Sequence, residues 1–383
     1  MNFIKLILKL SEKIKSFILI YLNTPSDAIK HPAQCLMSFV GACIYFLFKP
    51  MRPKRVVPPK IQSILIVRRN KLGDAIVTVL ALKALQIANP ETKLTIITDA
   101  YASPVFKTFL PDAVVIEPPS KYLRHFYFTG FHPSIKNHYQ KDFDVGINCS
   151  GSFSSKAIYM LNMFNCKWRI AVGGQKKYFW YLWLDDHAML PLELGKEHQM
   201  IKILSILRRT TLAVDLPFVP EMSSVKSDGQ RFLFFPESNR KESIWGLHNW
   251  IELKSKTERE GSFVAVCGSS KLKDAFPEVI SPDGTQALID LVRQFDHVVC
   301  SEGGASHLAA LCQKRITVLS GMSIANTWFP WSRDCLLIER TKSIRSVSVD
   351  DVLDVSLRRG DFEKISTSFD ASVKTDAGQI NLM

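Results

Sequence analysis

From residue 61 onward, two patterns of apolar residues alternate along the chain. Short continuous apolar runs, such as residues 61–67, are typical of strands buried inside a parallel sheet. Longer segments with apolar residues three or four positions apart, such as residues 74–87, indicate helices with an apolar face. Strands that alternate with helices in this way predict an α/β fold with doubly wound parallel sheets.

The alternation falls into two sets of elements, which predict two domains. The first set predicts a Rossmann-like domain at residues 61–194, and a long helix at 195–211 opens a bridging segment at 195–229. The second set predicts another such domain at 230–360, followed by a polar tail at 361–383 that is expected to be disordered. Strands are expected at 61–67, 93–98, 113–117, 143–148, 169–172, 232–235, 262–267, 297–300, 316–320 and 335–338. Besides the bridging helix, helices are expected at 74–87, 101–110, 156–164, 247–256, 285–294, 306–313 and 349–359.

Residues 1–60 follow a different pattern and predict a membrane-associating segment with a linker. Within residues 2–22, apolar residues share one helical stripe and lysines lie opposite, as in an amphipathic helix at a membrane interface. Packing of this helix against the protein's own core is the alternative, and no small-residue cleavage site of a signal peptide follows it. Residues 35–48 form an uncharged apolar run, shorter than the about 20 residues of a spanning helix, so an interfacial or re-entrant position is expected.

The charge balance favours an anionic membrane as a partner. The 383 residues carry a net charge of +13, and residues 1–60 hold ten Lys or Arg against two Asp or Glu. No zinc-finger, RRM or KH motif accompanies the basic residues, which argues against nucleic acid. The eight cysteines are scattered without a C-x-x-C pair, which predicts buried thiols in a reducing compartment. The dispersed His and Cys residues predict no metal site, and no cofactor is expected.

The stretch Cys300-Ser-Glu-Gly-Gly-Ala-Ser-His-Leu-Ala-Ala-Leu-Cys312 joins a predicted strand to a predicted helix through two glycines. Glycines at such a junction let the backbone approach a ligand, and the helix start offers free N–H groups and a partial positive charge. Both features favour a bound phosphate or diphosphate. A plain tight turn is the alternative.

Together with Arg315-Ile-Thr-Val-Leu-Ser-Gly321 and Trp328-Phe-Pro330, this stretch resembles the C-terminal motif of glycosyltransferase family 9. That family comprises the bacterial heptosyltransferases of the lipopolysaccharide inner core. Ile64-Leu-Ile-Val-Arg-Arg-Asn-Lys-Leu-Gly-Asp-Ala75 resembles the family's N-terminal motif, and the resemblance covers residues 61 to 358. It implies the GT-B fold, in which two Rossmann-like domains with parallel sheets face each other across a cleft. The nucleotide belongs to the second domain and the acceptor to the first.

The resemblance implies an inverting, metal-independent enzyme that moves a heptose from ADP-heptose to the lipopolysaccharide core. It also implies a cytoplasmic protein, peripheral on the inner membrane, whose basic stretch at 121–138 suits a phosphorylated glycolipid acceptor. A family member with another donor or acceptor is one alternative, and a noncatalytic membrane-associated scaffold with the same fold is another. A nicotinamide dehydrogenase and a P-loop NTPase are disfavoured, because neither G-x-G-x-x-G after the first strand nor G-x-x-x-x-G-K-[ST] is present.

Asp74 is the candidate general base, because it matches the family's Gly-Asp turn and a carboxylate can accept the proton of an attacking hydroxyl. An ordinary helix N-cap is its alternative role. His307 is a candidate phosphate ligand, with a structural role as the alternative. The further donor-binding candidates are Glu302, Gly303, Gly304, Ala305, Arg240, Lys241, Gly268 and Ser269, and the acceptor-binding candidates are Asn70, Lys71, Gly73 and Arg124.

Two places depart from the family's pattern and leave the donor open. Glu302 and Gly303 stand where the family has Asp followed by Ser or Thr, and Ser243 stands where it has a phosphate-binding Lys. Arg240 or Lys241 could reach the same phosphate from a shifted loop. Ordinary solvated turn residues are the alternative reading of Asn70, Lys71, Arg240 and Lys241.

Overall fold

The computed structural model describes most of the two predicted domains. The described residues are 58–69, 72–118, 141–150, 157, 160, 161, 164–172, 186–188, 197–214, 230–238, 241–321, 325–332, 334–339 and 344–357. The predicted membrane-associating segment lies outside them except for residues 58–60, and so do the tail at 361–383, the stretch at 121–138 and most of the helix expected at 156–164. Within the described ranges, no helix is both long and apolar enough to cross a membrane.

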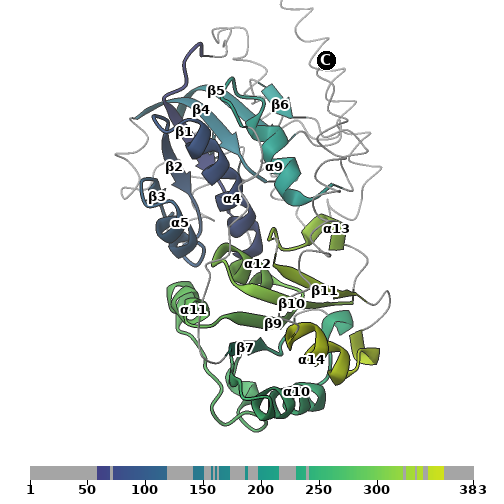
Figure 1. Ribbon diagram of the computed structural model, residues 1–383. Coiled ribbons are helices and arrows are strands. Elements are labelled where there is room, and N and C mark those ends of the chain that lie inside the picture. The colour runs from purple at the N-terminus through teal and green to yellow at the C-terminus, as the bar shows by residue number, and fades with distance from the viewer. Residues whose placement is uncertain are drawn as a thin grey trace, which may run out of the picture.

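The described chain forms two parallel sheets, one from each half (Figure 1). The N-terminal sheet has six strands in the order β3-β2-β1-β4-β5-β6, and the C-terminal sheet has five in the order β11-β10-β9-β7-β8. This confirms the predicted α/β class with parallel sheets. The strands are β1 Ser63–Val67, β2 Lys93–Ile97, β3 Val114–Ile116, β4 Asp142–Asn148, β5 Asn165–Val172, β6 Asp186–Ala188, β7 Arg231–Phe235, β8 Phe263–Val266, β9 His297–Ser301, β10 Arg315–Ser320 and β11 Cys335–Glu339.

The strand order reverses at one point in each sheet, and these points position the site. In the N-terminal sheet β1 lies between β2 and β4, and in the C-terminal sheet β7 lies between β8 and β9. In open α/β sheets, ligands bind outside the carboxyl ends of the strands at such a reversal. Strand β1 leads to Asp74, β7 leads to Lys241, and β9 leads to Gly303. The topology therefore brings the sequence motifs to the places where a ligand is expected.

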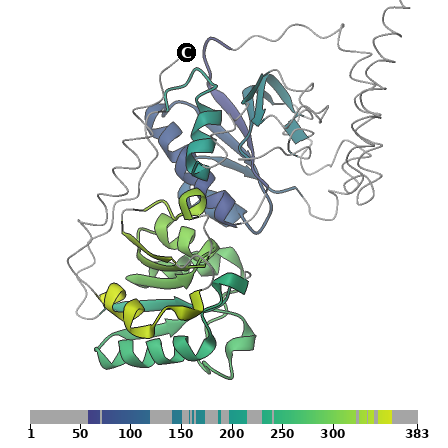
Figure 2. The ribbon, with the colours of Figure 1, turned by 90° about the vertical axis from the view of Figure 1, so that its right-hand side faces the viewer.

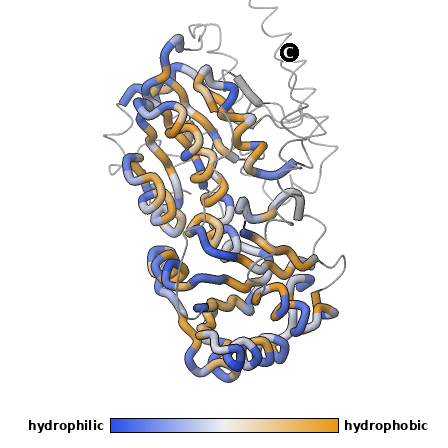
Figure 3. Tube along the Cα trace, in the orientation of Figure 1, coloured by the Kyte–Doolittle hydropathy of each residue, from blue (hydrophilic) through white to orange (hydrophobic). Residues whose placement is uncertain are grey.

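Helix α4, Leu72–Ala88, is the central helix of the structure. It packs against α5 and α9 of its own half and against α12 of the other half. Consecutive residues such as Ala75, Ile76 and Val77 are all buried, because a helix covered on several sides has no need of a polar face. Figure 3 shows the same apolar character along α4 and the strands. The other helices are α5 Ser103–Phe109, α9 Gln199–Leu207, α10 Leu247–Arg259, α11 Gly284–Arg293, α12 Gly304–Leu311, α13 Ala325–Trp328 and α14 Val349–Leu357, with 3-10 turns η5 Lys241–Ser243, η6 Ser270–Leu272 and η7 Ile344–Ser346.

Most expected elements are confirmed with shifted ends, and a few differ. Strand β5 begins at Asn165 rather than at residue 169, and its buried Cys166 packs under Gly146 of β4. The expected bridging helix is shorter, because His198 caps its start by accepting a hydrogen bond from the Met200 amide. Strand β6 and helix α13 were not expected, since segments of three and four residues carry no clear periodicity.

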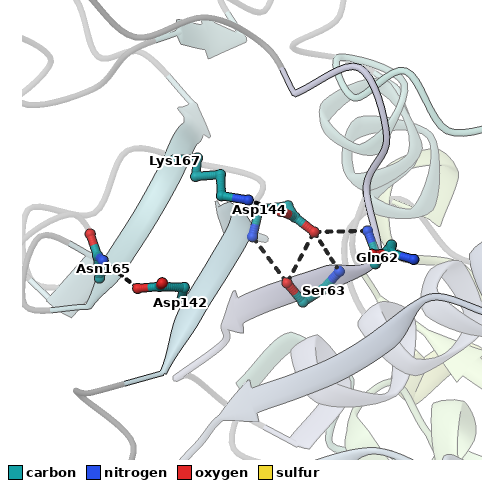
Figure 4. Close-up of polar contacts among 6 residues, drawn as sticks. All are labelled: Gln62, Ser63, Asp142, Asp144, Asn165 and Lys167. Carbon is teal, nitrogen blue, oxygen red and sulfur yellow. Dashed lines mark hydrogen bonds and ion pairs between the residues drawn. The ribbon is translucent and has the colours of Figure 1, made fainter. Parts of the chain in front are cut away.

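A buried carboxylate joins three strands at the amino end of the N-terminal sheet, away from the motifs (Figure 4). Asp144 Oδ2 accepts hydrogen bonds from the amides of Gln62 and Ser63, at 2.9 and 3.1 Å, and from the Ser63 hydroxyl. Its Oδ1 accepts from Lys167 Nζ at 2.8 Å. Burial alone would raise the pKa of Asp144, but these hydrogen bonds outweigh it and hold the pKa below its usual value. Asp144 therefore ties β1, β4 and β5 together.

Candidate active site between the two sheets

The N-terminal ends of α4 and α12 meet at the boundary between the two halves, where α12 lies directly below α4 in Figure 1 and the second view agrees (Figure 2). A Cβ placed on Gly304 would lie 3.6 Å from the Cβ of Leu72. A Cβ placed on Gly73 would lie 3.2 Å from Cδ2 of His307. The two motifs found in the sequence are therefore in direct contact.

Asp74 occupies the third position of α4 and forms an ion pair with Arg68. Asp74 Oδ1 lies 2.7 Å from a terminal guanidinium nitrogen of Arg68, and the two side chains are 17% and 2% exposed. The helix begins at Leu72, before Asp74, and the carboxylate turns to Arg68. The N-cap alternative for Asp74 is therefore wrong.

Arg68 was not singled out by the sequence analysis. Besides the carboxylate, its guanidinium donates to the backbone oxygen of Asp74 at 3.2 Å and to the backbone oxygen of Cys149 at 2.8 Å. Burial lowers the pKa of Arg68, and the charge of Asp74 opposes this shift. The available signal was the position itself: arginines are rarely buried without a partner, and this one ends an apolar strand.

Arg69 and Tyr101 also lie near this strand end and were not expected there. Arg69 binds Asp99 with two guanidinium nitrogens, at 2.9 and 2.5 Å. Burial and the charges of Asp99 and Asp74 raise the pKa of Tyr101 to about 12. The Tyr101 side chain is half exposed. The backbone oxygen of Tyr101 accepts a hydrogen bond from Thr285 of the other half at 2.5 Å. An ion pair and an aromatic residue that contacts the other half therefore follow strands β1 and β2.

The segment from Glu302 to the start of α12 forms the other side of the boundary. The Glu302 carboxylate accepts a hydrogen bond from Ser320 Oγ at 2.7 Å. Glu302, which stands where the family motif has the shorter Asp, is thereby held against the end of β10. Gly303 has an extended backbone and open space where a Cβ would be. Neither strain nor packing therefore requires glycine there. The first-turn amides of α12, which include those of Gly304 and Ala305, lack intrahelical partners by geometry and remain available to an anion.

His307 is buried in the packing of this boundary. It contacts Gly73 on one side, and its ring lies 6.1 Å from that of Trp328. Burial lowers the pKa of His307 to about 3, with a further contribution from His198, so the imidazole is neutral. These contacts agree with the structural role left open for this residue.

The other expected donor-side residues lie at the carboxyl ends of β7 and β8. Lys241 begins η5, which is held beside β10, since a Cβ on Gly321 would lie 2.1 Å from the backbone oxygen of Glu242. Ser269 donates both its amide and its hydroxyl to Glu237, at 2.7 and 2.5 Å. Gly268 lies under the same carboxylate. Ser269 is thus engaged within the protein, and Glu237, which the sequence analysis missed, occupies this loop.

Some buried side-chain N and O atoms have no hydrogen-bond partner among the described residues, although such atoms are normally paired. Four of these atoms belong to residues that end a strand or come after one in the chain. They are Thr98 Oγ1, Asn148 Nδ2, Ser243 Oγ and Ser301 Oγ.

Four expected site residues, Asn70, Lys71, Arg124 and Arg240, lie outside the described residues. Among the residues that are described, no group of three or more His, Cys, Asp or Glu is placed to hold a metal ion.

A scan against models of protein families gives no match, and a search of curated protein sequences gives none either. Solved structures do match. Escherichia coli heptosyltransferase WaaC with ADP has a TM-score of 0.60 at 14% identity, covering 76% of this chain and 98% of that one. E. coli ADP-heptose lipopolysaccharide heptosyltransferase II has a TM-score of 0.60 at 16% identity, covering 76% and 97%.

The family 9 glycosyltransferase from Veillonella parvula DSM 2008 has a TM-score of 0.63 at 13% identity, covering 80% of this chain and 98% of that one. Likeness at such low identity concerns the fold. In the arrangement of its two parallel sheets, the chain therefore has the GT-B-like fold of the glycosyltransferase family 9 heptosyltransferases, as the motif resemblance implied.

Proposed function

We propose that this protein is an inverting, metal-independent glycosyltransferase that uses a nucleotide-sugar donor. The observation that carries the proposal is the contact between the two motif helices. Leu72 and Gly73 at the start of α4 meet Gly304 and His307 of α12, and Asp74 is the next residue of α4. One helix end supplies a base and the other supplies donors for an anion. In this proposal, residues 61–194 bind the acceptor and residues 230–360 bind the nucleotide.

The reaction follows from these two ends. An acceptor hydroxyl oxygen attacks the anomeric carbon of the donor sugar, while Asp74 takes the hydroxyl proton. The bond from the anomeric carbon to the diphosphate oxygen breaks, and the nucleoside diphosphate leaves with the electron pair. A single displacement inverts the anomeric centre. Proton removal by a placed base typically contributes about 10²–10⁴-fold in rate.

The growing charge of the leaving diphosphate needs donors that are fixed beforehand. The amides of Gly303, Gly304 and Ala305 at the start of α12 are the proposed donors, with Lys241 and Arg240 from the loop after β7. Glu302 would act indirectly, by holding this segment against Ser320. No metal ion is required for charge neutralisation in this scheme.

The finer proposal concerns the substrates. Two matching structures are those of E. coli WaaC with ADP and with ADP-2-deoxy-2-fluoro heptose, which supports ADP-heptose as the first donor to test. The proposed acceptor is the lipopolysaccharide core at the cytoplasmic face of the inner membrane, with residues 1–60 holding the protein there. Asn70, Lys71, Gly73 and Arg124 are the proposed acceptor-side residues.

A different donor is the second candidate, and the open space at Gly303 favours it. This glycine leaves unfilled volume beside the proposed diphosphate site, and Ser243 brings no charge to it.

The experiment incubates purified protein with glycolipid from a strain that lacks it and with a panel of nucleotide sugars. The acceptor is then weighed by mass spectrometry. A heptose-sized gain that is absent with Asp74→Asn is the expected result. A gain of another sugar mass would replace the donor, and no gain with any donor, from folded protein, would overturn the proposal in favour of a noncatalytic scaffold.

A further inference from the structure

We infer that Arg68 is a positioning residue that fixes the carboxylate of Asp74 for proton transfer. The inference rests on the proposed function, because it concerns the base of that reaction. It goes beyond it by assigning a role to a residue that touches neither donor nor acceptor in the scheme above.

The contacts of Arg68 hold Asp74 at two points. One terminal guanidinium nitrogen binds Asp74 Oδ1 at 2.7 Å, and Nε binds the backbone oxygen of the same residue at 3.2 Å. The other terminal nitrogen binds the backbone oxygen of Cys149, just past the end of β4, at 2.8 Å. A side chain and its own backbone are thereby tied to one planar group. That group is itself anchored to the neighbouring strand end, so the carboxylate loses its freedom to rotate.

One carboxylate oxygen stays available. Arg68 takes Oδ1, and among the described residues Oδ2 makes no hydrogen bond. A general base must lie within hydrogen-bond reach of the proton that it removes, and small displacements of such a group cost rate steeply. The geometry therefore assigns Oδ1 to orientation and Oδ2 to the proton.

Stability alone gives no reason for this pair. Burying a guanidinium at 2% exposure costs desolvation that an ion pair at best roughly offsets, and apolar replacements of buried pairs are often neutral or stabilising. The neighbouring arginine cannot replace Arg68, because Arg69 directs two nitrogens to Asp99 instead. A buried charge that meets the candidate base at two atoms is better explained by orientation.

The test compares two substitutions at Arg68. Arg68→Gln keeps a hydrogen-bond donor, but it removes the positive charge and the set of guanidinium nitrogens that binds Asp74 and Cys149 at the same time. It is expected to lower kcat about 100-fold while KM for the donor stays within about twofold, since the base is misplaced and the donor site is untouched. Arg68→Lys keeps the charge and is expected to recover part of the loss. Arg169→Lys is the matched control, because Arg169 is a buried arginine that donates to the backbone oxygens of Leu161 and Phe164 in the same sheet.

The decisive measurement repeats Arg68→Gln in an Asp74→Asn background. If Arg68 acts through Asp74, the second substitution changes the residual rate by less than about twofold, because residues that act as a unit are non-additive. An equal loss in both backgrounds, or a loss matched by Arg169→Lys, would overturn the inference and make Arg68 a structural residue. If Arg68→Gln does not fold, Arg68→Lys enters the same cycle. Transfer by the wild-type protein tests the proposed function itself, and its absence would overturn both claims.

Discussion

At the residue scale, Gly73 shows how closely the two halves fit. A Cβ at this position would lie 3.2 Å from Cδ2 of His307, which is itself buried and packed by Trp328. The imidazole therefore has little room to move away. The absence of a side chain at Gly73 is a packing requirement set by the other half of the molecule.

We expect Gly73→Ala to destabilise the protein. Alanine favours a helix over glycine by up to about 1 kcal/mol, but the clash with His307 costs roughly 1–3 kcal/mol, so the net change is a loss. Gly304→Ala is the control, because its Cβ would lie at an ordinary 3.6 Å from Leu72. Urea unfolding of both variants is the measurement. Equal stability of Gly73→Ala and the wild-type protein would mean that the His307 ring shifts to make room for the added methyl group.

A second residue-scale prediction concerns Asp144. Its pKa is lowered in the folded protein, so its stabilising contribution is present above the ordinary aspartate pKa of about 3.9 and is lost as the pH falls below that value. Asp144→Asn should cost about 1–3 kcal/mol at neutral pH, because hydrogen bonds to a charged acceptor are lost. When the pH is lowered from 4 to 3, the variant should also lose less stability than the wild-type protein.

Unfolding measured at pH 7, 4 and 3 would check this, with Asp142→Asn as control. Asp142 lies at the exposed start of the same strand. In Figure 4 it has a single contact, a hydrogen bond that it accepts from Asn165. If the free energy of unfolding of Asp144→Asn falls with pH as that of the wild-type protein does, ionised Asp144 does not stabilise the fold in the way described.

At the element scale, the 3-10 turn η5 depends on the strand beside it. A Cβ on Gly321 would come within 2.1 Å of the backbone oxygen of Glu242, a distance that only a shift of the backbone can relieve. Because η5 begins with Lys241, the end of β10 fixes where this loop lies relative to the proposed diphosphate site.

Gly321→Ala should therefore push η5 away from β10. We expect a loss of roughly 1–3 kcal/mol in the free energy of unfolding and weaker binding of the nucleotide. Gly303→Ala should change the free energy of unfolding by less than about 0.5 kcal/mol, because its Cβ would meet open space on an extended backbone. Thermal unfolding and titration calorimetry with ADP are the measurements. Unchanged stability of Gly321→Ala would show that the turn adapts without strain.

The elements also show what the sequence could predict. The apolar runs and helical periods located the central strands, because these elements are buried and their patterns follow from burial. Asp74 was predicted from a local motif. Its partner Arg68 stands six positions earlier, but the contact from Arg68 to Cys149 spans 81 residues and depends on the strand order. Ser269 and Glu237 meet in the same way across 32 residues, and no local pattern predicts such a pair.

At the scale of the whole molecule, a buried histidine links the halves. His198 Nδ1 accepts from the Met200 amide at 3.1 Å, so Nε2 carries the proton that it donates to the backbone oxygen of Phe329 at 2.6 Å. The ring also packs on Trp331 at 5.0 Å. The start of α9 is thereby joined to the segment after α13, and the joint requires a neutral imidazole.

Acid should therefore weaken this protein well above the range of its carboxylates. Burial lowers the pKa of His198 to about 4 and that of His297 and His307 to about 3, each below the ordinary value of about 6.5. A lowered folded-state pKa means that the stabilisation is complete above pH 6.5 and declines as the pH falls toward 4.

Urea unfolding at pH 7.5, 6, 5 and 4.5 should show a steady loss of stability. His198→Gln should make this loss smaller, since glutamine does not titrate. His248, an exposed histidine on α10, provides the control variant His248→Gln, which leaves the buried imidazoles in place. A free energy of unfolding that stays constant from pH 7.5 to 4.5 would mean that burial of these imidazoles does not make the folded protein sensitive to acid.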